Sequence, residues 1–519
     1  MRSTFGQRLR TEKLARPPVL VAVVVAIVAA SLLPTPAVAN TANRETDSSL
    51  DSFVRQQRAD LGLPGLAVVV LSQGSVKFEG TYGDAYPRGP MVTLNTPFVL
   101  GSTSKQFTAL AVQQLISQRR LALSDSVGTV LREVGGAKSL FSTVTLAQLL
   151  SHTSGISEHT GREEFNPWPA VTSIRDEARR VLQSTPTAAP GAHFEYSNAN
   201  YALLGAVIEQ VTGRSFEDAL QVLVLEPLGL TSTTSDLELA RSNGLAASYY
   251  NWYGIVRAVT PGAMWPMGAP SAFITSTASD LTHLLQVHMG EPAGIAAATL
   301  ANARAPLTRA NEYSQYASGW FVRPFWELHD NDENSTDPSL PTLWEHSGNT
   351  ERSMSYLAFA PSLGLGVVVL SNSGLGTDQN KFSRFTESLL HQIVGTRDTP
   401  ATVDPLVAAA PLIMIGLPIL QLMMVAWLIV AAARPRHSRT GRWLPILVGA
   451  LITSATVFFA LVVVPSRTHT PIFEPTWWNA TPDLAVSVGV SLLAVTSWVA
   501  LIAVCLIRKK TYSTRQKHS

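Results

Sequence analysis

Cysteine and charge are both scarce in this sequence. The chain has 519 residues and a single cysteine, Cys505, which excludes an intrachain disulfide and a thiolate zinc or iron–sulfur site. Charged residues make up 15% of the chain, compared with roughly 25% in soluble globular proteins. The 39 Lys and Arg nearly balance 37 Asp and Glu, so the net charge of +2 gives no basic field for a nucleic acid. The shortage of charge, with 46% hydrophobic residues, indicates membrane segments.

Metal-binding patterns are also missing. The 11 histidines include no HExxH pair, which gives a metal hydrolase no support. The segment from His329 to Asn334 could begin a calcium loop, but Ser335 stands where such a loop needs glycine and Pro341 where it needs the closing glutamate. We therefore predict a solvated acidic loop there, and no metal or other cofactor.

Residues 1–39 have the order of a secretory signal peptide. Basic residues come first, followed by an uncharged apolar run from Val19 to Leu33 and then by Ala37-Val-Ala39. We predict cleavage after Ala39. Because the apolar run is long for a signal peptide, an uncleaved N-terminal anchor is the alternative. Whether this segment is a cleaved signal peptide or an uncleaved anchor, we expect the residues after it to be exported.

Three uncharged runs near the C-terminus each have the length of about 20 residues that a bilayer crossing needs. They predict transmembrane helices within residues 401–507, at 406–433, 444–464 and 484–507. The connector between the first two runs contains four Arg, and residues 508–519 form a basic tail. The second connector is poor in basic residues and contains Trp477 and Trp478. By the positive-inside rule, the first connector and the tail are cytoplasmic, and everything before the first run is extracytoplasmic.

Residues 40–400 have the composition of one large globular domain, without repeats or low-complexity tracts. Most of the stretch from Lys105 to Gln286 has the apolar periodicity of helices. Short runs rich in apolar residues near both ends predict two β-hairpins, at 66–71 with 76–80 and at 354–359 with 365–370. We predict an α/β (α+β) fold in which both ends of the domain form one antiparallel sheet, flanked by helices and a helical lobe. The cleft between sheet and lobe is the expected site.

Ser102 and Lys105 lie three residues apart at the predicted start of a helix, after Gly101. Residues at this spacing share a helix face, so the amine can reach the hydroxyl. The helix N-terminus also offers backbone N–H groups to developing negative charge. Taken alone, the pattern is weak, and an N-cap Ser beside an exposed Lys explains it better than a catalytic pair.

Two further motifs follow in order. Tyr196-Ser-Asn198 lies in a turn before a predicted helix from Tyr201 to Val211, and His346-Ser347-Gly348-Asn349 precedes the C-terminal hairpin. A glycine there lets a ligand or a neighbouring backbone approach closely. Taken singly, the first motif fits a turn with a side-chain cap, and the second fits an ordinary loop. Together with the Ser–Lys pair they form an ordered set.

This ordered set resembles the penicillin-recognising serine hydrolases, in the branch of class C β-lactamases, D-Ala-D-Ala carboxypeptidases, D-aminopeptidases and related esterases. The segments Leu149–Gly155 and Asn200–Gly213 are also similar to that branch, so the resemblance covers nearly the whole predicted domain. It implies a β-lactamase-like fold and an acyl-enzyme mechanism. It does not specify the substrate.

The resemblance also implies a role for each motif residue. Ser102 is the acylated nucleophile, Lys105 activates it, Tyr196 carries the proton to the leaving group, and Asn198 orients Lys105 and the bound amide. The general base is either Lys105 or Tyr196, because a hydroxyl must lose its proton to a nearby group whose pKa is close to the working pH. The main-chain N–H groups of Ser102 and Asn349 form the oxyanion hole. The remaining substrate-binding residues come from the same third motif: His346, Ser347 and Gly348.

His346 stands where β-lactamases commonly have Lys. A Lys there is a permanent positive charge suited to a substrate carboxylate, whereas His, with an unperturbed pKa of about 6.5, is mostly neutral at pH 7. The difference favours amide or ester substrates that lack the carboxylate.

An exported serine-hydrolase domain followed by three membrane helices resembles the prodrug-activating peptidases, such as the colibactin-maturing peptidase, which remove an N-acyl-D-asparagine cap. We therefore expect a membrane-anchored serine peptidase that cleaves an amide next to a D-residue, in a small-molecule or peptide substrate that can carry a lipid-like acyl chain. The alternatives are a cell-wall D-Ala-D-Ala carboxypeptidase or D-aminopeptidase, an esterase, a β-lactamase, and a non-catalytic penicillin-binding-like protein. Membrane lipids are expected partners.

Overall fold

The computed structural model divides into two compact units, Met1–Glu45 and Thr46–Ser519. The structure describes residues 46–162, 171–252, 255–259, 266–329, 337–350, 353–374, 380–398, 405–433 and 482–517. Several predictions lie outside these ranges. They are the signal peptide at 1–39, the acidic loop after His329, the membrane segment at 444–464 and the two connectors that flank it.

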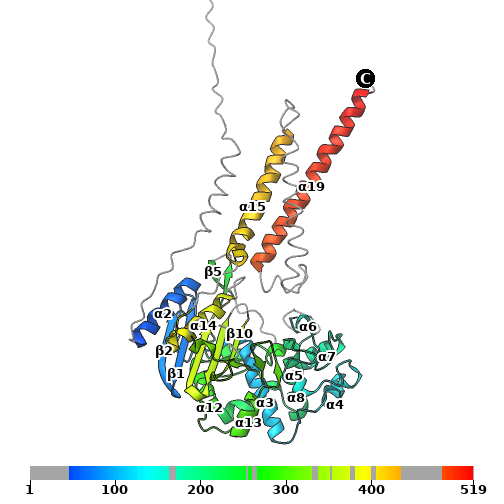
Figure 1. Ribbon diagram of the computed structural model, residues 1–519. Coiled ribbons are helices and arrows are strands. Elements are labelled where there is room, and N and C mark those ends of the chain that lie inside the picture. Colours follow the sequence, from blue (N-terminus) through cyan, green and yellow to red (C-terminus); the bar gives the residue numbers. More distant parts are fainter. Residues whose placement is uncertain are drawn as a thin grey trace, which may run out of the picture. The chain divides into compact units, whose positions relative to one another are not determined.

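An eight-stranded antiparallel sheet forms the centre of the domain (Figure 1). Its strand order is β2-β1-β12-β11-β10-β9-β8-β7. The strands are β1 (Gly65–Ser72), β2 (Ser75–Gly83), β7 (Thr308–Arg309), β8 (Gln315–Tyr316), β9 (Phe321–Pro324), β10 (Thr342–Asn349), β11 (Met354–Ala360) and β12 (Leu365–Ser371). β1 pairs with β12, with Leu66 opposite Ser371. The expected antiparallel sheet, built from both ends of the domain, is therefore confirmed.

Both predicted hairpins are present. The first is β1–β2, whose turn residues Gln73 and Gly74 have φ angles of 52° and 73°. Positive φ at both central residues is typical of the two-residue turns that match the twist of a hairpin. The second is β11–β12. The sequence did not predict β7, β8 and β9, which are short strands of two to four residues that extend the sheet.

Helices cover both faces of the sheet. Because strand side chains alternate, Val68 and Val70 of β1 join one apolar cluster, whereas Val69 and Leu71 join the other. On the first face lie α2 (Thr46–Leu61) and α14 (Asn380–Val394), where Phe53 and Phe385 stack with ring centroids 6.3 Å apart. On the second face lie α3 (Ser104–Ser117) and α12 (Ala278–His288).

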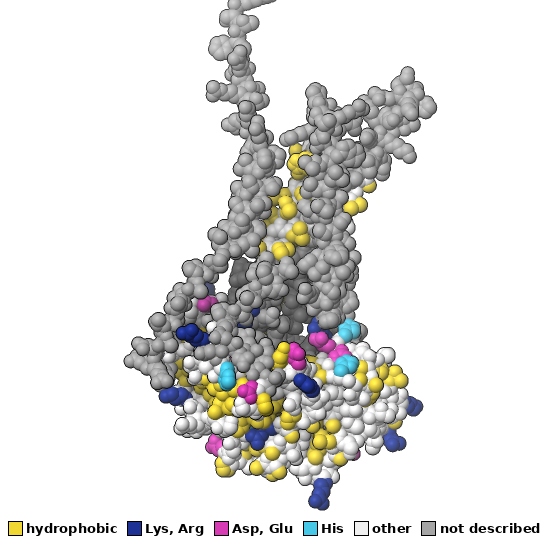
Figure 2. Space-filling view, in the orientation of Figure 1, with side chains coloured by type: hydrophobic (Ala, Val, Ile, Leu, Met, Phe, Trp, Pro, Cys, Tyr) yellow, Lys and Arg dark blue, Asp and Glu magenta, His cyan; other side chains and the backbone are white. Residues whose placement is uncertain are grey.

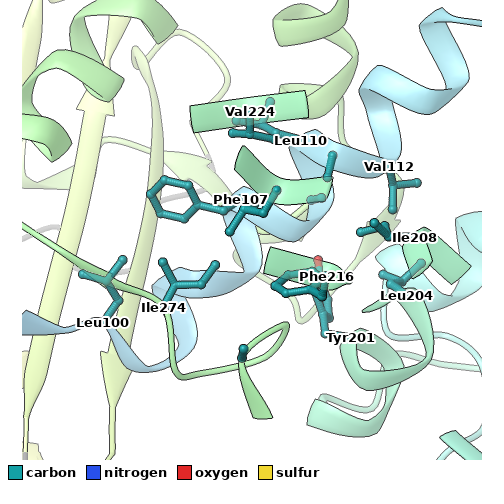
Figure 3. Close-up of a cluster of buried hydrophobic side chains, with 14 of the residues drawn as sticks. Leu100, Phe107, Leu110, Val112, Tyr201, Leu204, Ile208, Phe216, Val224 and Ile274 are labelled. Carbon is teal, nitrogen blue, oxygen red and sulfur yellow. The ribbon is translucent and has the colours of Figure 1, made fainter. Parts of the chain in front are cut away.

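The predicted helical lobe is built around α3 and α8 (Asn198–Thr212). Figure 3 shows Phe107, Leu110 and Val112 of α3 in the same buried cluster as Leu204 and Ile208 of α8. Its other helices are α4 (Val127–Val130), α5 (Leu146–Leu150), α6 (Glu158–Arg162), α7 (Ile174–Gln183), α9 (Phe216–Leu220), α10 (Glu226–Leu228), α11 (Leu237–Ser242) and α13 (Ala297–Arg304). Two small sheets complete the fold: β3 (Phe98–Val99) with β6 (Thr275–Ser276), and β13 (Ser373–Gly374) with β4 (Ser248–Trp252) and β5 (Ile255–Val259).

Two further helices, α15 (Pro405–Ala433) and α19 (Pro482–Lys517), contain the predicted membrane segments 406–433 and 484–507. Over the residues that the structure describes, no helix offers an apolar stretch long enough to cross a membrane.

On the face of the molecule drawn in Figure 2, acidic and basic side chains are interspersed among uncharged ones.

His288, near the end of α12, is a buried neutral histidine. It is 1% exposed, it stacks on Phe359 at a centroid distance of 5.3 Å, and Trp320 lies edge-on at 5.5 Å. Within the described chain, neither ring nitrogen has a hydrogen-bond partner. Burial, together with the positive charge of Arg304, lowers the pKa of His288 to about 3. The unfolded chain therefore takes up a proton near pH 6.5 that the folded chain does not.

We predict that His288→Leu makes the protein less sensitive to acid. Between pH 7.5 and pH 5, protonation of His288 in the unfolded chain lowers the free energy of unfolding by about 2 kcal/mol. The Leu variant has no group that titrates there, so its free energy of unfolding should not fall by this amount. Urea unfolding of both proteins at the two pH values measures the difference. An equal loss of stability in both proteins would show that His288 is not held neutral.

Candidate active site

The predicted nucleophile lies in a tight turn. Gly101–Thr103 form a 3-10 turn, η1, and α3 begins only at Ser104, so Ser102 precedes the α-helix instead of opening it as predicted. Two hydrogen bonds to the carbonyl oxygen of Leu100 stabilise this turn. Thr103 Oγ1 donates one at 2.9 Å, and Ser355 Oγ donates the other at 2.5 Å. Since Ser355 belongs to β11, these bonds fix the nucleophile turn to the sheet.

The amine of Lys105 is surrounded by three oxygen acceptors. Its Nζ lies 3.1 Å from Ser102 Oγ, 2.7 Å from Asn198 Oδ1 and 2.9 Å from the carbonyl oxygen of Ser271. The Lys105 side chain is 0% exposed. An ammonium has three N–H donors, and a buried charge is stable only when it is paired or hydrogen-bonded. Three acceptors therefore suit the charged form of Lys105.

The Tyr-x-Asn turn also reaches this amine. Asn198 is the first residue of α8, and Tyr196 lies two residues before it. The centroid of the Tyr196 ring is 4.9 Å from Lys105 Nζ, within the range of a cation–π contact. The structure thus brings Asn198 and the Tyr196 ring to the amine of Lys105.

Two glycines allow β10 to lie directly against the nucleophile turn. A Cβ atom at Gly348 would overlap the carbonyl of Leu100, and a Cβ atom at Gly101 would overlap the main-chain nitrogen of Asn349. Because β9 pairs with β10 only along Thr342–Glu345, the second half of β10 faces η1 instead. The main-chain nitrogen of Asn349 thus lies beside Gly101, the residue that precedes Ser102.

His346 is buried in the site as a neutral ring. It is 3% exposed, and burial, followed by the charge of Lys105, lowers its pKa to about 3. Nδ1 lies 2.7 Å from the carbonyl of Ser347, which can only accept, so Nδ1 carries the proton. Nε2 accordingly accepts from the hydroxyl of Tyr316 at 3.3 Å. Ser347 is exposed, and strand alternation directs its side chain to the opposite face from His346 and Gly348.

Sequence reasoning missed Ser271 and Ser355, which contribute a carbonyl and a supporting hydroxyl. The Ser271 contribution has no sequence signal, because any residue supplies a carbonyl. Within the described ranges, no group of three or more His, Cys, Asp and Glu side chains is placed to hold a metal ion.

This combination of fold and site defines a β-lactamase-like serine hydrolase. The family model described as Beta-lactamase matches residues 50–386, and the chain belongs to this family. Among curated proteins, the chain is similar to protein flp of Staphylococcus aureus (strain COL), with 27% identity over 340 residues that cover 63% of each chain. It is also similar to penicillin-binding protein 4 of Amycolatopsis lactamdurans, with 29% identity over 354 residues covering 66% of this chain and 88% of that protein.

Solved structures show the same fold. A class C beta-lactamase has a TM-score of 0.57 and 24% identity, covering 70% of this chain and 99% of its own. The D-alanine carboxypeptidase AmpC of Burkholderia cenocepacia has a TM-score of 0.54 and 22% identity, covering 67% of this chain and 98% of its own. The expected β-lactamase-like fold and the resemblance to penicillin-recognising serine hydrolases are therefore confirmed.

We predict that Ser102→Ala abolishes covalent labelling by a fluorophosphonate probe, because the attacking oxygen is removed. Lys105→Ala and Tyr196→Phe should each slow acylation by roughly 10² to 10⁴, the usual contribution of acid–base assistance. Labelling rates measure both effects, and Lys138→Ala, at an exposed Lys, is the matched control. An unchanged acylation rate in the Lys105 variant would contradict its assignment.

Proposed function

We propose that this protein is an extracytoplasmic serine hydrolase that cleaves an amide next to a D-residue and matures a prodrug capped with an N-acyl-D-amino acid. The observation that carries the acyl-enzyme step is the contact of 3.1 Å between Lys105 Nζ and Ser102 Oγ. Asn198 and the Tyr196 ring complete the same arrangement.

The proposed reaction proceeds in two halves. Ser102 Oγ attacks the amide carbonyl, its proton passes to the general base, and the oxyanion is bound by the main-chain N–H groups of Ser102 and Asn349. The C–N bond then breaks as Tyr196 gives a proton to the leaving amine. Water hydrolyses the resulting ester and restores Ser102. Because the three acceptors around Lys105 suit its charged form, we assign the base role to Tyr196, whose ring centroid lies 4.9 Å from the ammonium.

The neutral state of His346 supports an uncharged substrate group at β10. A ring whose pKa is lowered to about 3 offers no cation to a carboxylate between pH 5 and pH 8. A C-terminal D-Ala-D-Ala peptide has such a carboxylate, whereas the internal amide of an acyl-D-Asn prodrug does not. Cell-wall D-peptidase activity is the second candidate, because the similar proteins include a penicillin-binding protein and a D-alanine carboxypeptidase. Esterase and β-lactamase activities, and a non-catalytic role, rank below it.

We predict that His346→Lys changes the substrate preference. Wild-type kcat/KM should be higher for an N-acyl-D-asparaginyl amide than for a muropeptide ending in D-Ala-D-Ala, because the neutral ring cannot pair with the terminal carboxylate. The Lys variant should lose activity on the first substrate and gain on the second. His346→Gln, a neutral polar replacement, should not gain on the muropeptide.

The same assay separates the candidates. Wild-type kcat/KM on the neutral substrate should show no decline as pH rises through 6.5, because His346 does not titrate there. Higher wild-type activity on the muropeptide would instead support the cell-wall function. Equal preference in all three proteins would show that His346 does not set specificity.

The localisation proposal rests on the sequence alone, since no helix of the described residues has an apolar stretch long enough to cross a membrane. We place residues 40–400 outside the cytoplasmic membrane, residues 401–507 in three membrane crossings and residues 508–519 in the cytoplasm. A domain held at the outer membrane face is well placed to receive an amide substrate that carries a lipid-like acyl chain.

We predict a definite pattern for reporter fusions. Fusions after Arg439 should be active only with a reporter that works in the cytoplasm, and fusions after Trp478 only with a reporter that works after export, because arginines are retained inside. Reporter activity in intact cells, normalised to fusion protein abundance, is the measurement. The reverse pattern would overturn the proposed localisation.

A further inference from the structure

His152 holds the main chain on both sides of Tyr196. It lies in the turn after α5 and is 1% exposed. Its carbonyl oxygen accepts a hydrogen bond from the Glu195 N–H at 2.9 Å, and its ring Nδ1 accepts one from the Ser197 N–H at 3.1 Å. The two donors are the residues immediately before and after Tyr196. One residue, distant in sequence, therefore fixes the path of the chain through the proposed proton carrier.

The ring of His152 also contacts the Tyr196 ring itself. The two rings stack with centroids 4.3 Å apart and an interplanar angle of 29°. Tyr316 and Tyr201 pack against other parts of the imidazole, at centroid distances of 5.0 and 5.3 Å. Rotation of the Tyr196 ring is thus restricted by its stacking partner, in addition to the restraint on its backbone.

The hydrogen bonds define the protonation state of His152. A main-chain N–H can only donate, so Nδ1 is unprotonated and the ring proton resides on Nε2. Asn200 Nδ2 lies 3.1 Å from the same Nδ1, while Asn200 Oδ1 accepts from Ser154 Oγ at 2.5 Å. Burial, together with the charge of Lys105, keeps the pKa of His152 well below its usual value. The ring is neutral and adds no second cation beside Lys105.

Two energetically unfavourable local features accompany the position of His152. Its φ angle is +55°, in the left-handed region that a residue with a Cβ rarely adopts. In the part of the chain that the structure describes, its buried Nε2 has no hydrogen-bond partner. The hydrogen bonds on both sides of Tyr196 accompany this backbone conformation.

From this arrangement we infer that His152 is a positioning residue, which holds the Tyr196 hydroxyl in the geometry that proton transfer at Ser102 requires. The inference rests on the proposed role of Tyr196 in acyl transfer. In the proposed mechanism, His152 contacts neither Ser102 nor the bond that is broken. It acts only through Tyr196.

Two substitutions separate the two contacts of His152. His152→Asn retains an acceptor near the Nδ1 position and tolerates a positive φ, but it lacks the ring. His152→Phe retains a ring and loses the acceptor. Because small displacements of catalytic groups cost up to about 10²-fold, we expect kcat to fall roughly 10-fold for Asn and 10²-fold for Phe. KM should change little, because substrate contacts are not removed.

The decisive measurement is a double-mutant cycle with Tyr196→Phe. If His152 acts through Tyr196, either substitution should lower the residual kcat of the Tyr196→Phe protein by less than about 3-fold. A loss of the same factor in both backgrounds would overturn the positioning role, because a purely structural residue weakens both equally. If the Phe variant fails to fold, the Asn variant alone completes the cycle. His159→Asn, at an exposed His, is the matched control.

Labelling of the wild-type protein keeps this test separate from the proposed function. If a fluorophosphonate labels wild-type Ser102 and the cycle is additive, the positioning role is wrong and the serine mechanism stands. If wild-type Ser102 is not labelled, the proposed function itself fails, and with it the role of His152. Labelling together with a non-additive cycle supports both.

Discussion

The buried amine of Lys105 is the constraint on which the site depends. A charge removed from water costs several kcal/mol unless acceptors replace the lost hydration. Here the acceptors come from three distant parts of the chain: Ser102 in η1, Asn198 at the start of α8, and the carbonyl of Ser271. Satisfying one ammonium therefore requires the nucleophile turn, the helical lobe and the segment before β6 to meet at one point. The same contacts that stabilise the charge assemble the reactive groups.

Much of this arrangement could be predicted from the sequence. The short apolar runs at 66–80 and 354–370 predicted the hairpins, because a hairpin needs only a local pattern and a turn. The spacing of Ser102 and Lys105 predicted their contact, although Ser102 lies in η1 and not on the α-helix. The prediction that Tyr196, Asn198 and Gly348 lie in the same site as Ser102 and Lys105 depended on the resemblance to a family. No local rule brings such distant residues together.

Other features had no sequence signal. The carbonyl of Ser271 is a backbone group that any residue supplies, and β7 and β8 have two residues each, too few for a periodic pattern. His152 belongs to a segment that resembled the family, yet neither its left-handed backbone nor its stacking on Tyr196 can be read from its neighbours. These properties arise from tertiary contacts, which override local propensity.

The pairing of β1 with β12 has a consequence for when the protein becomes active. Gly65 donates to the side chain of Asn372, a residue 307 positions further along the chain. A chain made from its N-terminus therefore carries Ser102 and Lys105 long before the strands that support them exist. Contacts of such long range form late, because closing a long loop costs entropy before any pairing compensates for it. During synthesis the nucleophile is therefore present without its assembled site until the last strands of the sheet are made.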